Sequence, residues 1–286
     1  MPTVVIPAYN EAQGIERTLR AVLAQEIANL TVIVVPNACV DDTAARARTF
    51  EPRVIVVETA TPGKPEAMNL AEETLRARGL DSFPRLFLDA DIELEAGTLA
   101  AMLARCVGST PKIVAAKPRF DVSRCSLFVR LFYQARVFNP WHSAGAPNGS
   151  GTFMVNASGR ALWGAFPSII SDDSFVERHF APTAQETVHE AHSIVRVPRT
   201  LAGLRAVAAR KRLGAQELDG LFPARADGRD AGGTARIMLR KMIPRPHFWP
   251  GLCAFFWIKT LERLDRKSAA QKQGQARWQQ DRSSRD

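Results

Sequence analysis

The chain has 286 residues, of which 46% are hydrophobic and 23% are charged. This is the composition of a globular protein with a substantial core. No apolar run approaches the roughly 20 residues that span a bilayer, and residues 1–13 lack the features of a secretion signal. The four cysteines lie far apart without a CxxC pair, which argues against a disulfide framework or a thiolate zinc site. We therefore expect a folded protein of the reducing cytoplasm.

The positive charge is concentrated in the C-terminal part of the chain. The net charge is +9, and residues 201–286 hold 18 basic and 8 acidic residues, against 20 basic and 21 acidic residues before them. A basic segment of this kind suits an anionic membrane surface, a nucleic acid or another polyanion, and it is equally compatible with a solvated face.

The first half of the chain alternates between short apolar runs and segments with helical periodicity. Asn10 and Gln13 have the spacing of a capping box, which predicts the start of the first helix. The predicted strands are residues 4–7, 30–35, 54–57 and 85–88, and the predicted helices are residues 10–23, 66–78 and 98–106. Repeated strand–helix units predict an α/β fold with a mostly parallel central sheet and helices on both faces.

The alternation becomes less regular beyond residue 113. The further predicted elements are strands at 113–117 and 152–155, a helix after Asp173, a basic helix at 201–213, a polar linker at 224–233 and a disordered tail over the last twenty residues. We predict a domain at 1–215, with a first half at about 1–114 and a second half at about 115–215. A linker and a basic amphipathic helical segment follow at 216–286.

The most informative segment is RLFLDADIE, residues 85–93, in which an apolar strand ends in two carboxylates. At the carboxyl end of a parallel strand, Asp89 and Asp91 can bind a divalent cation together with its diphosphate, and the small Ala90 between them leaves space for a nucleoside. A three-residue pattern also arises by chance, and a solvated turn is the alternative.

Three further polar segments follow predicted strands, at residues 7–11, 36–43 and 63–69. Ligands bind at the carboxyl ends of strands in open α/β sheets. Taken singly, Asn10 can be explained as a helix cap and Lys64 as a solvated charge. Taken together, the segments predict one crevice.

These segments resemble the inverting family 2 glycosyltransferases of the GT-A fold over residues 3–215. The matching pieces are VVIPAYNEAQGIERTL, VIVVPNACVDDTA, GKPEAMN, LFLDADIE, GSGTFMV, SDDSFVERHF and RKRLGAQEL. The resemblance implies transfer of a sugar from a nucleoside diphosphate sugar, with a UDP-sugar favoured, to an acceptor hydroxyl. It also implies inversion of the anomeric carbon and a Mg²⁺ or Mn²⁺ cofactor.

The resemblance assigns donor-binding residues position by position. It implies that Asp89 and Asp91 hold the ribose and the metal–diphosphate complex, that Lys64 approaches the donor and that Asn37 contacts the nucleobase. The other donor-binding positions that it implies are Pro7, Ala8, Tyr9, Glu11 and Ala90.

The adjacent carboxylates Asp172 and Asp173 match the acidic pair of the family at the start of a helix. A single displacement needs a base that takes the proton of the acceptor hydroxyl, and the resemblance implies Asp173 in this role with support from Asp172. Helix capping is the alternative explanation. Gly149, Ser150 and Gly151 are assigned to the acceptor side, with an ordinary turn as the alternative.

Two departures from the family pattern affect the donor site. The QxxRW motif, which lies over the diphosphate in many members, is absent, and Arg210 and Arg212 are the candidates to replace it, unless they belong to a merely basic face. Residues 36–39 read PNAC where Asp-Asp-Gly-Ser is common, which weakens any inference about the nucleobase. Neither a GxGxxG fingerprint nor a GxxxxGK[ST] loop is present.

Residues 247–258 are apolar and aromatic, are flanked by basic residues and are too short to span a bilayer. A helix on an anionic leaflet fits this combination and would bring the enzyme to a lipid-linked or cell-envelope glycan, while packing against the protein is the alternative. No nucleic acid partner is expected.

Two other function classes stay open. A sugar-phosphate nucleotidylyltransferase would need a glycine-rich basic loop near the N-terminus, where this chain has PAYNEAQG. A non-catalytic membrane or nucleic-acid binding protein would leave the carboxylates at the strand ends unexplained.

Overall fold

The computed structural model describes residues 1–136, 138, 150–222 and 231–269, with the backbone alone for 231–235 and 262–269. The described chain forms two compact units. The first comprises residues 1–119 and 150–195, and the second comprises residues 120–136, 138, 196–222 and 231–269. Each unit has its own hydrophobic core. Most of the predicted tail and most of the predicted linker at 224–233 lie outside the described residues, and the described parts of both are helical, 231–233 in a helix that begins at Ala231 and 267–269 in one that ends at Ala269.

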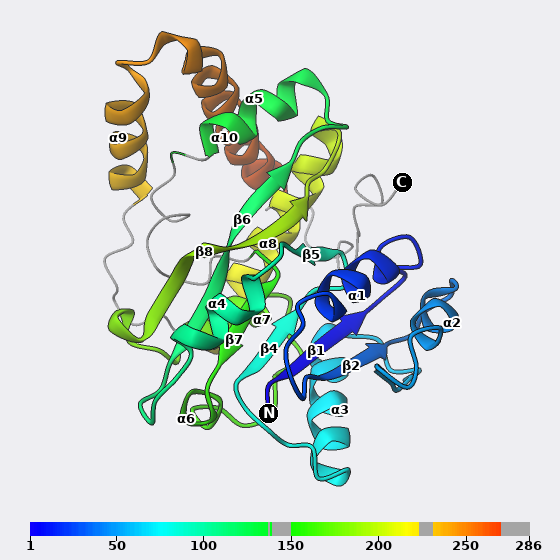
Figure 1. Cartoon of the computed structure of the whole chain (residues 1–286). Coiled ribbons are helices and arrows are strands. Elements are labelled where there is room, and N and C mark those ends of the chain that lie inside the picture. Colours follow the sequence, from blue (N-terminus) through cyan, green and yellow to red (C-terminus); the bar gives the residue numbers. More distant parts are fainter. Residues whose placement is uncertain (137, 139–149, 223–230, 270–286) are drawn as a thin grey trace. The chain divides into compact units, whose positions relative to one another are not determined.

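Half of the central sheet in the first unit is parallel (Figure 1). The parallel strands follow the order β3 (Ile55–Val56), β2 (Thr31–Pro36), β1 (Thr3–Ala8) and β4 (Arg85–Leu88). Because β1 lies between β2 and β4 and runs parallel to both, the carboxyl ends of these three strands share one edge of the sheet.

The other half of the sheet contains strands of both directions. It continues from β4 through β7 (Thr152–Val155), β6 (Ile113–Asp121), β8 (Gln185–Arg196) and β5 (Ile92–Leu94). β7 is antiparallel to both β4 and β6, and β5 is antiparallel to β8. The predicted α/β fold is therefore confirmed, with a mixed sheet in which the antiparallel strand β7 interrupts the run of parallel strands. The pairing of Leu88 with Thr152 brings the chain that enters β7 beside the chain that leaves β4.

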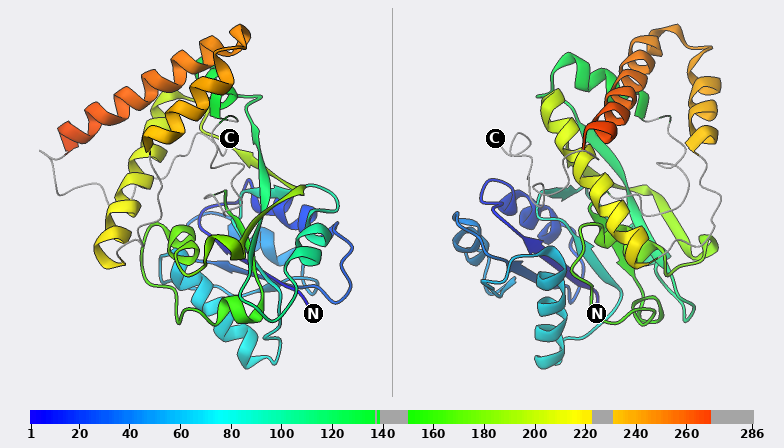
Figure 2. Two further views of the ribbon diagram at one scale, coloured as in Figure 1. Left: turned by 90° about the vertical axis from the view of Figure 1, so that its left-hand side faces the viewer. Right: turned by 180° about the vertical axis from the view of Figure 1, so that it is seen from behind.

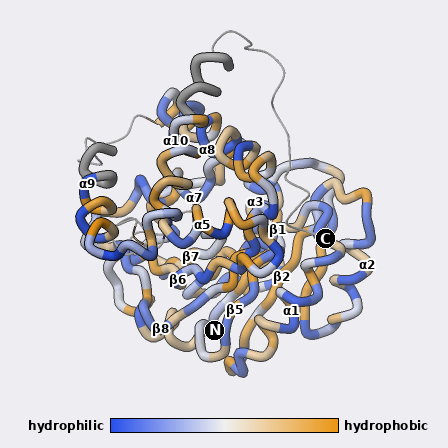
Figure 3. Tube along the Cα trace, turned by 90° about the horizontal axis from the view of Figure 1, so that it is seen from above, coloured by the Kyte–Doolittle hydropathy of each residue, from blue (hydrophilic) through white to orange (hydrophobic). Residues whose placement is uncertain are grey.

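Helices cover both faces of the parallel strands. The helices of the first unit are α1 (Ile15–Leu23), α2 (Thr43–Arg48), α3 (Lys64–Ala77), α4 (Thr98–Arg105), α6 (Ala157–Arg160) and α7 (Asp172–Glu177), with a short 3-10 helix η2 (Pro182–Ala184). α1 places Leu19 in one core with Val4 and Ile6 of β1, and α3 packs on β1 and β2. Figure 3 shows the hydrophobic stretches of β1 and β2 in orange, which is the pattern of strands buried on both faces.

The capping box predicted at Asn10 is wrong. α1 begins at Ile15, and the main-chain N–H groups of Gly14 and Ile15 both donate to the carbonyl oxygen of Glu11. Asn10 adopts a left-handed backbone conformation with φ of 52°. Its side-chain oxygen accepts a hydrogen bond from the N–H of Val40 at 2.9 Å. A contact with the loop after β2 thus replaces the expected local cap.

The second unit is helical. Its elements are α5 (Leu127–Arg136), α8 (Leu201–Leu221), α9 (Ala231–Met242), a 3-10 helix η3 (Pro246–Phe248) and α10 (Trp249–Ala269). α5 and α10 lie side by side (Figure 2). A Cβ added at Gly251 would lie 2.8 Å from the carbonyl oxygen of Leu131, so the close approach of the two helices requires glycine there. The rings of Phe132 and Phe255 stack with centroids 5.5 Å apart.

Most of the apolar segment predicted at residues 247–258 therefore packs on α5 within the second unit. Phe255 and Ile258 belong to the core of this unit, whereas Trp249 and Trp257 are about half exposed. In the part of the chain that the structure describes, no helix is both long enough and apolar enough to cross a membrane.

We expect Phe132→Ala to lower the free energy of unfolding by about 3–5 kcal/mol, because it leaves a cavity in the core shared by α5 and α10. The neighbouring Leu127 is 70% exposed, so the control Leu127→Ala should change stability by no more than about 0.5 kcal/mol. Urea denaturation followed by tryptophan fluorescence and circular dichroism measures both variants. Equal stabilities of the two variants would contradict this packing.

Candidate active site

Hydrogen bonds connect the end of β1 to the loop after β2 and to the start of α3. The carbonyl oxygen of Ala8 accepts hydrogen bonds from both the main-chain N–H and the side-chain amide of Asn37, each at 2.8 Å. The side-chain oxygen of Asn37 accepts a third bond from the N–H of Gly63 at 3.1 Å. Asn37 is only 2% exposed and joins the ends of β1 and β2 to the start of α3.

A second group of contacts ties the segment after β1 to the loop after β2. The hydroxyl of Thr43 accepts from the N–H of Glu11 at 2.7 Å, and the carboxylate of Asp41 accepts from the N–H of Ala12 at 3.1 Å. Asp41 also accepts from both the N–H and the hydroxyl of Thr43. Thr43 lies in the matching segment VIVVPNACVDDTA, but the sequence pattern assigns it no role of its own. Pro7, Ala8 and Glu11 are buried, and Tyr9 is half-buried.

Three charged side chains meet at the same edge of the sheet. The Lys64 ammonium lies 2.7 Å from a carboxylate oxygen of Asp89 and 2.9 Å from a carboxylate oxygen of Asp172. α3 begins at Lys64 because Gly63, with φ of 138°, turns the chain, and because Pro65 is favourable in a first helical turn. Asp89 follows β4 directly, and Asp172 is the first residue of α7. Residues distant in the sequence therefore form one charge cluster.

Burial and charge have opposite effects on the pKa values in this cluster. Burial raises the pKa of the Asp172 carboxyl to about 6, although the Lys64 ammonium opposes this shift. Burial alone would lower the pKa of Lys64, but the charges of Asp172, Asp89 and Asp173 outweigh it and hold that pKa above its usual range. Lys64 is therefore a cation throughout the physiological range.

Asp89 is also fixed by the strand that pairs with β4. Its N–H donates to the carbonyl oxygen of Gly151 at 2.9 Å. Gly151 has φ of 73°, and a Cβ there would lie 2.7 Å from a carboxylate oxygen of Asp89. Glycine is thus required both by the backbone conformation and by the close approach. Ser150 is buried beside it, and Gly149 lies outside the described residues.

The turn that carries the second carboxylate packs against α1. Ala90 is buried, and its carbonyl oxygen accepts from the hydroxyl of Thr18 at 2.8 Å. A Cβ at Gly14 would come within 3.6 Å of the Cα of Asp91. The Asp89–Asp91 turn is therefore held by both α1 and β7.

The chemistry of these donors fits a magnesium or manganese ion. In the described parts of the chain, no three His, Cys, Asp or Glu side chains gather as metal ligands. Mg²⁺, however, commonly binds through one or two carboxylates together with substrate phosphates and water. Asp89 and Asp91 supply two hard oxygen donors at one turn, and only one oxygen of Asp89 is in contact with Lys64.

The two adjacent acids of α7 have different surroundings. The side chain of Asp172 is 6% exposed and pairs with Lys64. Asp173 is half-buried, and its carboxylate accepts from the N–H of Ser174 at 2.8 Å. Of the two carboxylates, Asp173 is the one more open to an incoming hydroxyl group. Arg210 and Arg212 lie on α8 in the second unit, and their assignment to the diphosphate stays a prediction.

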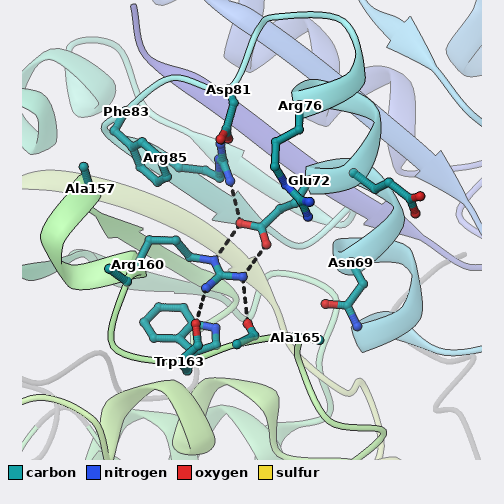
Figure 4. Close-up of a pocket in the computed structure, with 13 residues that line it drawn as sticks. Asn69, Glu72, Arg76, Asp81, Phe83, Arg85, Ala157, Arg160, Trp163 and Ala165 are labelled. Carbon is teal, nitrogen blue, oxygen red and sulfur yellow. Dashed lines mark hydrogen bonds and ion pairs between the residues drawn. The ribbon is translucent and has the colours of Figure 1, made fainter.

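A separate pocket of about 580 Å³ lies at the opposite end of β4 (Figure 4). Arg85 begins β4 and Asp89 follows its end, so the strand rise places them about 13 Å apart. In the pocket wall, Glu72 of α3 forms ion pairs with both Arg85 and Arg160. Glu72 and Arg160 belong to no motif of the sequence, and the RLFLDADIE segment that begins at Arg85 gives no sign of these ion pairs.

The comparisons with known proteins agree with this geometry. A family model described as glycosyl transferase family 2 matches residues 3–153, more than half of the chain. No curated protein matches the chain at the sequence level.

Solved structures of glycosyltransferases have a similar fold. A mannosyltransferase from Pyrobaculum calidifontis in complex with GDP-Man and Mn²⁺ aligns with a TM-score of 0.59 and 20% identity, over 96% of this chain and 81% of that chain. Glucosyl-3-phosphoglycerate synthase from Mycobacterium tuberculosis in complex with UDP aligns with a TM-score of 0.52 and 19% identity, over 80% of this chain and 82% of that chain. At these identities the likeness concerns the fold.

The family match extends from β1 through Asp89 and Asp91 into β7, and it excludes the nucleotidylyltransferase and non-catalytic alternatives. The chain is a glycosyltransferase and belongs to glycosyl transferase family 2.

Proposed function

We propose that this chain is a metal-dependent, inverting glycosyltransferase that moves a sugar from a nucleoside diphosphate sugar to an acceptor hydroxyl. The single observation that carries this proposal is the cluster in which Lys64 contacts both Asp89 and Asp172. Lys64 thus holds the donor-side carboxylate Asp89 close to the acidic pair. A direct displacement requires donor and acceptor to be held close together in this way. The division into a transferase domain at 1–215 and an extension at 216–286 stays a prediction.

On the donor side, Asp91 and Asp89 would hold the divalent ion and the ribose. A bound Mg²⁺ or Mn²⁺ would offset the negative charge that develops on the leaving diphosphate. Pro7, Ala8, Tyr9 and Glu11 would line the base and ribose pocket, around the loops that Asn37 and Thr43 hold together. Because the side-chain amide of Asn37 already bonds Ala8 and Gly63, its role would be to shape the base pocket.

A uridine donor remains our preferred assignment. One structural neighbour was solved with UDP, and another with GDP-Man and Mn²⁺. The loop at residues 36–39 lacks the usual acidic pair, so the base specificity rests on the shape of the pocket.

On the acceptor side, we assign Asp173 as the base. It is the more exposed acid of the pair, and deprotonation of the acceptor hydroxyl needs a carboxylate within hydrogen-bond reach of it. Asp172 would support Asp173 by fixing Lys64 and the first turn of α7. Gly149, Ser150 and Gly151 would bring the backbone close to the reacting sugars.

The second unit offers a surface suited to an anionic membrane. At the corner between α9 and α10, Ile243 is 57% exposed and Trp249 is 51% exposed, and the indole N–H of Trp249 donates to the carbonyl oxygen of Ile243 at 3.2 Å. The exposed cations Lys241 and Arg245 lie in the same segment. Tryptophan beside basic residues favours the headgroup region of anionic lipid. We propose peripheral binding on the cytoplasmic side, with a lipid-linked or envelope glycan as acceptor.

We expect Asp91→Asn and Asp173→Asn to separate donor binding from transfer. Asp91→Asn should weaken metal-dependent nucleotide binding by about tenfold or more, because it removes a charged metal ligand. Asp173→Asn should leave binding within about twofold and reduce turnover by about 10²–10⁴-fold, because it removes only the base. Calorimetric titration with UDP, GDP, CDP and ADP, with and without Mn²⁺, measures binding. Release of nucleotide from the matching sugar donor measures turnover.

The same titration tests the proposed function as a whole. Metal-dependent binding of one nucleotide, weakened in Asp91→Asn, supports a nucleotide-sugar transferase. Failure of the wild-type protein to bind any of the four nucleotides would contradict it.

The pH dependence of turnover should have an acid limb near pH 6. The pKa of Asp172 is raised to about 6 by burial, so Asp172 is ionised and paired with Lys64 above this pH and becomes protonated as the pH falls through it. We therefore expect turnover to decline below about pH 6. In Asp172→Asn, turnover should be lower throughout and should lack this inflection. Rates of nucleotide release between pH 5 and 9 test this, and an unchanged inflection in the variant would assign it to another group.

Binding to lipid should depend on charge and on the α9–α10 corner. Neutralising Lys241 and Arg245 with Gln should reduce partitioning onto vesicles that contain phosphatidylglycerol by about 2 kcal/mol, roughly 30-fold, since each basic residue contributes about 1 kcal/mol. The matched control neutralises the exposed Arg76 and Arg78 of the first unit. Sedimentation with anionic and with pure phosphatidylcholine vesicles measures the effect. No binding of the wild-type protein, or equal binding to both vesicles, would contradict the proposed surface.

A further inference from the structure

The segment that leads to the acidic pair is held by side chains of α3. The carboxamide of Asn69 forms two hydrogen bonds with the main chain of Phe166: its nitrogen donates to the Phe166 carbonyl oxygen at 2.9 Å, and its oxygen accepts from the Phe166 N–H at 2.8 Å. One side chain thus satisfies both main-chain groups of a residue in a loop, as a neighbouring strand would. Asn69 is the last residue of the GKPEAMN segment, and the proposed donor and base roles do not explain it.

A second contact holds the same segment slightly earlier in the chain. Glu72, one helical turn beyond Asn69, binds the guanidinium of Arg160 through both carboxylate oxygens. The same guanidinium donates to the carbonyl oxygens of Trp163 at 2.7 Å and Gly164 at 2.9 Å (Figure 4). The turn from Arg160 to Phe166 is therefore attached to α3 through Asn69 and Glu72.

α3 also holds the far end of this segment. Lys64, at the first turn of α3, contacts Asp172, which follows Phe166 by only six residues. Along the helix axis, Lys64 and Asn69 are about 7.5 Å apart. Two residues of one rigid helix thus fix both ends of residues 166–172, and the start of α7 has little freedom to move relative to Lys64.

We propose that Asn69 is a positioning residue for the acidic pair, in that it fixes Phe166 and thereby sets where Asp172 and Asp173 lie relative to Lys64. This inference rests on the proposed function. Asn69 touches neither Asp172 nor Asp173 in the contacts described here, so it acts through the backbone of residues 166–172. A displacement of about 1 Å at a reacting group is enough to lower turnover strongly.

Asn69→Ala is the decisive variant. Removal of Glu72 would instead leave Arg85 and Arg160 without their shared carboxylate and endanger folding. The matched control is Glu73→Ala, since Glu73 lies on the exposed side of the same helix. Asn69→Asp is a second variant, because it keeps an acceptor for the Phe166 N–H but places a carboxylate oxygen against the Phe166 carbonyl.

We expect Asn69→Ala to reduce the turnover of nucleotide release by at least tenfold while the Kd for nucleotide and metal stays within twofold of the wild type. Asn69→Asp should behave similarly, and Glu73→Ala should match the wild type. The acid limb of the pH profile should shift in Asn69→Ala, because the contact of Asp172 with Lys64 is altered. A variant that is only less stable, assayed at a temperature at which it is still folded, would keep the acid limb of its pH profile at the wild-type pH.

Hydrogen exchange of the full chain, read by mass spectrometry, tests the positioning without an activity assay. Peptides that cover residues 161–177 should exchange faster in Asn69→Ala, while peptides from β1 and β2 should not change. Wild-type turnover and an unchanged acid limb in Asn69→Ala would overturn the proposal, and so would unchanged exchange over residues 161–177. If the wild type binds no nucleotide, the proposed function fails, and the exchange result still decides whether Asn69 holds this segment.

Discussion

The Lys64 ammonium and its two carboxylate partners are the interaction on which the site depends. Of the three side chains only Asp172 is buried, since those of Lys64 and Asp89 are 32% and 36% exposed. A buried charge is tolerated only when it is paired, so Asp172 needs the Lys64 ammonium. Lys64 comes from the start of α3, Asp89 from the end of β4 and Asp172 from the start of α7. The need to pair these charges therefore restricts three elements at once. Such a cluster contributes more to a defined geometry than to net stability, since the cost of desolvation offsets much of the attraction.

The mixed sheet explains why these charges can meet. A parallel strand delivers its carboxyl end to the ligand edge of the sheet, and β4 delivers Asp89 there. The next strand in the sheet, β7, is antiparallel and therefore starts at that same edge, where the carbonyl of Gly151 accepts from the N–H of Asp89. The change of direction after β4 thus places the start of β7, and not its end, beside Asp89.

The sequence predicted the elements whose pattern is local. The strands at 85–88 and 152–155 agree with β4 and β7 because each is an apolar run bounded by polar residues. β6 extends to Asp121, beyond the predicted residue 117, and α8 extends to Leu221, since these ends carry no apolar pattern. β5 and β8 were not predicted as strands, because β5 has only three residues and polar residues interrupt every apolar run in β8. A motif could indicate Lys64 and Asp172 separately, but it could not indicate the contact between them, because the two residues lie far apart in the sequence.

The adjacent acids of α7 have different surroundings, and the proposed function gives them different roles. Consecutive residues on a helix point about 100° apart, so when one faces inward its neighbour faces a different surrounding. Asp172 faces Lys64 and is buried, which raises its pKa. Asp173 is half-buried and bonds the N–H of Ser174. Under the proposed function, Asp173 exchanges a proton with the acceptor, whereas Asp172 must keep its charge to pair with Lys64. The helix separates these demands by placing the two carboxylates on different faces of one turn.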